Sequence, residues 1–126
     1  MSPPPGRLRP FPGSLTIERE AGGRRVLRLS GDVDSAAVAE FESRQGSLPV
    51  GVDVLDAGAV SFLGSTGLAV MVRYAEAAIE DGRRPVLRAA SAPVDQLLRA
   101  AGIETYFPRP DAGQPRAGDE APGASQ

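Results

Sequence analysis

The residues of this chain best suited to chemistry are two neighbouring hydroxyls, Ser65 and Thr66, in the segment SFLGSTGLAVM. They stand between Gly64 and Gly67, where an apolar run changes into a pattern with helical spacing. Glycine leaves the backbone around these hydroxyls accessible, and the amino end of a helix favours a negative charge. The segment therefore predicts a helix start that can hold a phosphate.

Familiar catalytic patterns do not fit this serine. GSTG lacks the lysine and the glycine spacing of a P-loop, and GSTGL does not match the nucleophile elbow of hydrolases. The chain has no histidine and no cysteine, so it lacks the usual general base, the commonest metal ligand and any thiolate. We therefore expect no enzyme activity, no metal and no cofactor. Helix capping is the simpler role for Ser65, and a functional role stays open beside it.

Two carboxylates, Asp32 and Asp34 in SGDVD, fall between a predicted strand and a predicted helix. Capping of the helix and a favourable charge at its positive end explain them most simply. The alternative is that they belong to an acidic contact surface. Further along, Asp56 ends a valine-rich strand and is placed to brace the loop that follows.

Length and composition indicate one globular domain. The chain has 126 residues, a net charge of -2 and 41% hydrophobic residues, which suits a single modest core. Proline and glycine concentrate at both ends, so residues 1–14 and 108–126 are predicted to be disordered tails around a domain of residues 15–107. Ten arginines and thirteen acids in that domain exclude the basic footprint of a nucleic-acid-binding protein. No apolar run can span a membrane and no signal peptide is evident, so we expect a cytoplasmic protein without direct membrane insertion.

The hydrophobic pattern predicts alternating strands and helices. Strands are expected over residues 15–19 and 25–31 as a hairpin, then over 50–56, 85–89 and the final ETYF. Residues 57–64 are expected to form a loop. This order predicts an α/β fold: a single domain with a central mixed β-sheet of four to five strands and helices packed against it.

Three helices are expected between these strands. The first begins at Asp34 or Ser35 and ends at Gly46, and the third runs from a Ser91 cap to a Gly102 stop. The second begins at Ser65. Its predicted core stripe consists of Leu68, Met71, Val72, Ala75, Ala78 and Ile79.

Taken in order, the segments LRLSGDVD, VDVLDAGAVSFLGSTGLAVMVRYAEAAIEDGRRPVLRAAS and VDQLLRAAGIETYF resemble the STAS domain of bacterial anti-sigma factor antagonists. The resemblance spans nearly all of residues 15–107. It includes the acidic strand end at Asp56, the aromatic Phe62, the Ser65–Thr66 pair and the terminal leucine-glycine-aromatic pattern.

The resemblance implies a partner switch. In this family an anti-sigma factor that is also an ATP-dependent serine kinase phosphorylates the antagonist at the serine that starts this helix. The unphosphorylated antagonist binds the kinase and frees a sigma factor, and a PP2C-type phosphatase resets it. By position the acceptor is Ser65, with Thr66 as the possible alternative. The partner-binding residues implied are Asp32, Asp34, Gly64, Ser65, Thr66 and Gly67.

One position differs from the family pattern, because Gly64 stands where aspartate commonly precedes the acceptor. This difference motivates a second hypothesis of another class. In it the chain is a STAS module that is not phosphorylated and acts as a structural subunit of a transporter or other signalling complex. Purification together with a transporter ATPase, and not with a kinase, would favour this alternative.

Overall fold

A computed structural model describes residues 12–110 of the chain. Its elements, in chain order, are β1 (Ser14–Arg19), β2 (Arg25–Val33), α1 (Ser35–Gln45), β3 (Val54–Leu63), α2 (Ser65–Glu80), β4 (Val86–Ala90), α3 (Ala92–Ala101) and a short 3-10 helix, Glu104–Tyr106. The predicted tails fall mostly on residues 1–11 and 111–126, which lie outside the described residues.

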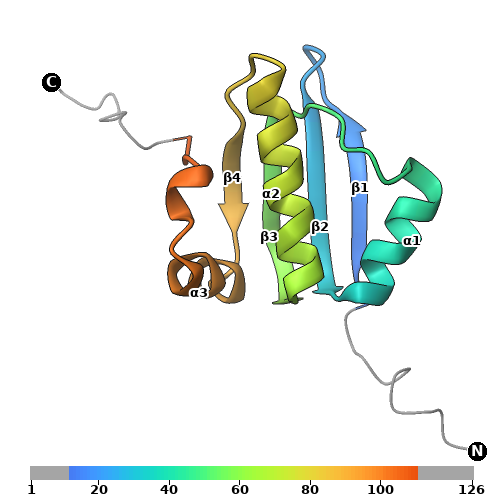
Figure 1. Ribbon diagram of the computed structural model, residues 1–126, viewed down its shortest axis with the longest axis vertical. Helices are drawn as coiled ribbons and strands as arrows, with labels where there is room; N and C mark the ends of the chain where they lie inside the picture. Colours follow the sequence, from blue (N-terminus) through green and yellow to red (C-terminus); the bar gives the residue numbers. More distant parts are fainter. Residues whose placement is uncertain (1–11, 111–126) are drawn as a thin grey trace, which may run out of the picture.

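The four strands form one mixed sheet in the order β1-β2-β3-β4, which confirms the predicted α/β fold. β1 and β2 are the predicted antiparallel hairpin. β2, β3 and β4 run parallel to one another. Figure 1 shows α1 and α2 on the same face of this sheet, with α3 beside the ends of β3 and β4. The helices therefore cover one face and leave the other face of the sheet open.

The core lies between the sheet and α1 and α2. β2 places Leu27, Leu29 and Val33 in it at every second position, as the pleat of a strand requires. α1 contributes Phe41, and its N-cap is Asp34, whose carboxylate accepts the Ala37 N–H at 2.9 Å. This contact confirms the predicted capping role of Asp34.

β3 differs from the prediction, because residues 57–64 were expected to form a loop and the strand instead extends to Leu63. Two register shifts against β2 each insert an additional residue into β3. Its core side chains therefore recur at uneven spacing, at Leu55, Ala57, Val60 and Leu63. β-bulges of this kind interrupt the period-two pattern that identifies a strand in a sequence.

The face that α2 presents to the sheet is rotated from the predicted stripe. Its fully buried residues are Gly67, Val70, Met71, Tyr74, Ala75 and Ala78. Leu68 and Val72 are only partly buried, and Ile79 is 55% exposed. Rows of apolar residues at helical spacing run along both sides of this helix, so the pattern alone did not indicate which row packs inward.

The end of the domain also differs from the prediction. ETYF does not form a strand, because Glu104–Tyr106 is a turn of 3-10 helix. The following Phe107 is buried in the core, and the Leu87 N–H donates to the Pro108 carbonyl at 2.8 Å. Gly102 ends α3 in the left-handed conformation with φ 70°, as the sequence predicted.

Tyr74→Phe is expected to raise the free energy of unfolding by about 1 kcal/mol, because it removes an unsatisfied buried hydroxyl. Tyr74 is 2% exposed, its ring packs against Phe41, and its hydroxyl finds no hydrogen-bond partner within residues 12–110. Denaturant titration of both proteins measures the change. Tyr106→Phe is the matched control, since that exposed hydroxyl donates to Glu76 at 3.3 Å. A loss of stability in Tyr74→Phe would show that the hydroxyl has a partner in solution.

Candidate functional site

The candidate site lies where β2 and β3 end side by side. Asp32 pairs with Phe62 and Val33 with Leu63, and the Gly64 N–H donates to the Val33 carbonyl at 3.0 Å. Because the two strands are parallel, α1 and α2 both begin at this edge, the lower one in Figure 1. In open α/β sheets this carboxyl edge is the usual position of binding sites.

Ser65 and Thr66 are the first two residues of α2, and both are exposed. The N-cap of α2 is Gly64, so Ser65 is not the cap that its sequence position first indicated. Neither hydroxyl has a hydrogen-bond partner in the part of the chain that the structure describes. The first backbone bond of the helix runs from the Leu68 N–H to the Gly64 carbonyl, at 3.0 Å. The earlier N–H groups of α2 therefore lack acceptors within the helix, as at any helix start.

The two glycines around these hydroxyls have different roles. A methyl group at Gly67 would lie 2.7 Å from both Leu63 Cδ1 and Val33 Cγ1, so Gly67 allows the first turn of α2 to pack closely on the strands. Gly64 has an extended backbone with φ -85° and ψ 176°, and a Cβ there would lie 3.4 Å from the Phe62 ring. The fold thus requires glycine at position 67 and leaves room for a side chain at position 64.

The acidic residues of the site are held in different ways. Asp34 is engaged as the cap of α1. Asp32, at the end of β2, accepts a hydrogen bond from the Ser61 hydroxyl at 2.7 Å. Asp32 forms no ion pair within residues 12–110. Of the two carboxylates, Asp32 is therefore the one that does not cap a helix.

Two residues of this edge were not predicted as site residues. Ser61 is the additional residue at the second bulge of β3, which places its hydroxyl on Asp32. Phe62 is 51% exposed although it is a large aromatic side chain. The resemblance to the family included Phe62, and this was the signal available in the sequence. Because residues 57–64 were predicted to form a loop, the pairing of Phe62 with Asp32 in the sheet was not predicted. The site therefore combines a carboxylate, an exposed aromatic ring and two free hydroxyls.

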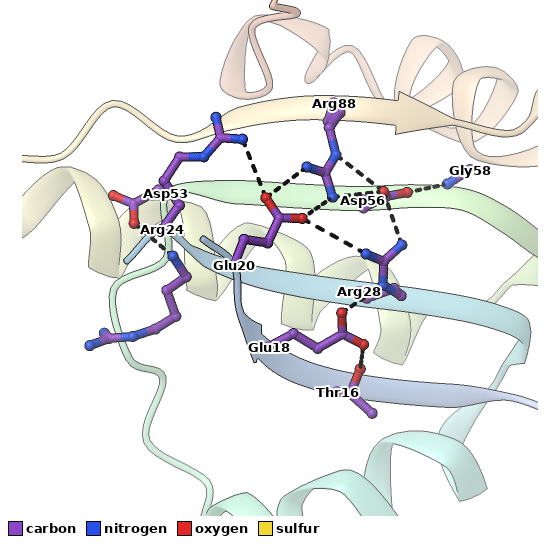
Figure 2. A network of polar contacts seen from close by, with 10 residues as sticks. Thr16, Glu18, Glu20, Arg24, Arg28, Asp53, Asp56, Gly58 and Arg88 are labelled. Atoms are coloured by element: carbon purple, nitrogen blue, oxygen red, sulfur yellow. Dashed lines mark hydrogen bonds and ion pairs between the residues drawn. The ribbon is translucent and has the colours of Figure 1, made fainter. Parts of the chain in front are cut away.

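The open face of the sheet carries a network of ion pairs, shown in Figure 2. Arg28 of β2 contacts Glu18 at 3.0 Å and Asp56 at 3.2 Å. Arg88 of β4 contacts Asp56 at 3.2 Å and Glu20 at 2.9 Å. Parallel sheets usually have both faces covered, and here this charged layer joins the hairpin to β3 and β4 across the uncovered face.

Asp56 was predicted to brace a following loop, but its carboxylate instead accepts the N–H of Gly58 within the continuing strand β3, at 3.1 Å. The same carboxylate accepts hydrogen bonds from Arg28 and Arg88, which the sequence did not indicate as its partners. Asp56 is the third residue of β3, whereas Ser65 follows the end of this strand. We therefore assign Asp56 to the structure of the sheet and not to the candidate site.

The melting temperature is expected to be constant above about pH 5 and to fall as pH drops through the titration of Glu20 and Asp53. Hydrogen bonding to Arg88 lowers the pKa of Glu20 below its ordinary 4.5, and the Arg25 N–H lowers the pKa of Asp53 below 3.8. A carboxyl group whose pKa is lower in the folded protein stabilises the fold at pH values above its ordinary pKa. This stability is lost as the pH falls through the pKa of the folded state.

Calorimetry between pH 2 and 7 tests this expectation. Asp53→Asn should flatten the acid fall, since it removes one of the titrating groups. Glu40→Gln is the control, because the exposed Glu40 carboxylate forms no ion pair among the described residues and its removal should leave the profile unchanged. An equal effect of both variants on the acid fall would show that Asp53 is not one of the groups responsible for it.

Among residues 12–110 no group of three or more His, Cys, Asp or Glu side chains is placed to hold a metal ion. None of the helices in that range has the length and apolar character of a membrane span.

Comparisons with known proteins agree with this architecture. A family model described as "Mlab, STAS domain" matches residues 17–108. A solved structure described as "Structure of the Anti-Sigma Factor Antagonist SpoIIAA in its Unphosphorylated Form" is similar in fold, with a TM-score of 0.56 and 19% identity over 75% of this chain and 86% of that one. No curated protein matches the chain. The family match covers all three α-helices and most of the sheet, and this chain therefore belongs to the STAS domain family.

Proposed function

We propose that this protein is an anti-sigma factor antagonist that binds an anti-sigma factor kinase and is switched off by phosphorylation at Ser65. The observation that carries the proposal is the exposed, unbonded Ser65 hydroxyl in the first turn of α2, at an edge that also presents Asp32 and Phe62. Membership of the STAS family and the fold shared with a protein described as an anti-sigma factor antagonist support it. Thr66 is the alternative acceptor.

The predicted contact residues divide into two groups in this proposal. Asp32, Ser65 and Thr66 would meet the kinase, and Gly64 connects the end of β3 to the first residue of α2. Asp34 and Gly67 would position the site, because Asp34 caps α1 and Gly67 lets the first turn of α2 pack closely on β2 and β3. The exposed ring of Phe62 joins the contact surface, since aromatic side chains often anchor protein interfaces.

Phosphorylation would act on binding and not on folding. A helix start accommodates an anion with a gain of about 0.3–1 kcal/mol, so phosphoserine at position 65 leaves α2 intact. When a partner closes over the site, the phosphate loses its water, and among residues 12–110 no arginine contacts Ser65 or Asp32. An unpaired charge desolvated in this way costs several kcal/mol. A PP2C-type phosphatase would restore the binding form in the cytoplasm, and the protein itself would catalyse nothing.

The test is to incubate the full-length protein with ATP and candidate kinases, and to map the phosphosite by mass spectrometry. Labelling is expected at Ser65 and absent in Ser65→Ala. Ser61→Ala is the matched control, because Ser61 is exposed at the same edge and bonded to Asp32. Gly64→Asp provides a further arm, since the backbone there leaves room for the side chain that the family commonly has.

A second candidate function is a STAS module that is not phosphorylated and serves as a structural subunit of a transporter or another signalling complex. The observation that favours it is Gly64, which leaves the acceptor position without the neighbouring carboxylate that is common in the family. Purification of the tagged protein with a transporter ATPase, together with no labelling of wild type or Gly64→Asp, would support this candidate over the first.

A further inference from the structure

A groove of about 840 Å³ lies at the carboxyl end of α2, between this helix and the segment that follows α3. Ile79 and Tyr106 line it and are 55% and 39% exposed. Pro85 and Pro108 extend this apolar lining. The groove is remote from Ser65, because Glu76, the first residue of α2 that lines it, lies about 16 Å further along the helix.

Three charged residues of the groove form no ion pair within residues 12–110, and one of them, Glu76, accepts a hydrogen bond from the Tyr106 hydroxyl at 3.3 Å. The other two have opposite charges and lie at the rim. Glu80 and Arg84 both line the groove and are exposed, and neither forms an ion pair within residues 12–110. Their neighbour Arg83 is different, because it binds Asp53 at 2.7 Å and Asp81 at 3.0 Å. An apolar centre with unpaired charges at its rim has the general composition of a protein interface.

We propose that the occupant of this groove is the same groove of a second copy of the chain. In a two-fold dimer each patch faces itself, so residue i meets residue j and j meets i. Glu80 of one copy then faces Arg84 of the other, and the same pair forms again on the other side of the axis. Ile79 and Tyr106 of both copies fill the centre. Another protein would have to carry both charges in the matching order, whereas a second copy carries them by symmetry.

This dimer would be weak and would leave the candidate site free. Nine residues line the groove, fewer than the roughly 20–30 that each partner contributes to a standard interface, so the association belongs to the transient class. The two Ser65 edges lie at the ends of α2 that point away from the shared grooves. The inference does not depend on the proposed function, because neither phosphorylation nor a kinase enters it.

Sedimentation velocity on the full-length protein over a concentration series tests the proposal. The weight-average mass of the wild type is expected to rise from monomer toward dimer with concentration. Ile79→Asp should abolish this rise without unfolding, since the side chain is largely exposed. Leu48→Asp is the matched control, being an exposed apolar residue outside the groove. Circular dichroism confirms that each variant is folded.

A charge exchange locates the interface. Glu80→Arg alone and Arg84→Glu alone place like charges opposite each other twice in the dimer, and each should weaken self-association about tenfold or more. An equimolar mixture of these two single variants should associate again, because each then supplies the charge that the other lacks. The double variant Glu80→Arg/Arg84→Glu should behave like the wild type.

A wild type that stays monomeric throughout the series overturns the proposal. A dimer whose dissociation constant is the same in the two single charge variants as in the wild type also overturns it, since such a dimer must use another surface. Binding of a different protein in the groove by a monomeric wild type also overturns it. All three results leave the phosphorylation proposal untouched, because that is tested on separate variants.

Discussion

Ser65→Asp is expected to weaken binding to the partner kinase more than a hundredfold while the melting curve and the circular dichroism stay those of the wild type. A carboxylate at the start of α2 is stable in water, because the helix dipole favours it. At the proposed kinase interface this carboxylate would be desolvated without a partner of opposite charge. A cost of about 3 kcal/mol corresponds to more than a hundredfold in the dissociation constant.

Isothermal titration calorimetry with the purified kinase measures this effect. Ser65→Ala should bind at least as tightly as the wild type and should no longer be switched by ATP. Thr66→Ala should still be phosphorylated, which separates the two hydroxyls. If Ser65→Asp bound as tightly as the wild type and no kinase labelled Ser65, the proposal of a phosphorylation switch would be wrong. The function as a structural subunit would then replace it.

Val70→Asp is expected to unfold the domain or to lower its free energy of unfolding by more than about 4 kcal/mol. Val70 is 0% exposed and packs in the core between α2 and the sheet. A carboxylate at this position would be buried without a partner. Since domains of this size are stable by only about 5–15 kcal/mol, such a loss removes much of the folded population.

Denaturant titration followed by circular dichroism measures this loss. Ile79→Asp, on the exposed side of the same helix, is the control and should change stability by less than about 0.5 kcal/mol. Val72→Asp should fall between them, because Val72 is partly buried. The stripe predicted from the sequence contains Val72 and Ile79 but not Val70, so it would instead make Val72→Asp and Ile79→Asp more severe than Val70→Asp. The three variants therefore decide which face of α2 packs inward.

Features that depend on neighbouring residues were predictable from the sequence. The β1–β2 hairpin follows from a turn signal between two alternating segments, and the caps at Asp34 and Gly102 follow from side-chain and backbone preferences at single positions. The helix start at Ser65 and the α/β order follow from a change of hydrophobic period. Each signal acts within a few residues and is therefore present in the sequence itself.

Features that depend on contacts between distant segments were decided by the tertiary structure. β3 continues past Asp56 because β2 pairs with it through two bulges, and these bulges remove the regular spacing of Leu55, Ala57, Val60 and Leu63. The inward face of α2 was decided by the close approach of Gly67 to Val33, which brings Val70 and Tyr74 onto the sheet. The same packing brings Ile79 and Tyr106 together from segments far apart in the chain. Burial is a property of assembled surfaces, so a helix with apolar residues on two sides acquires its inward face only when the sheet is in place.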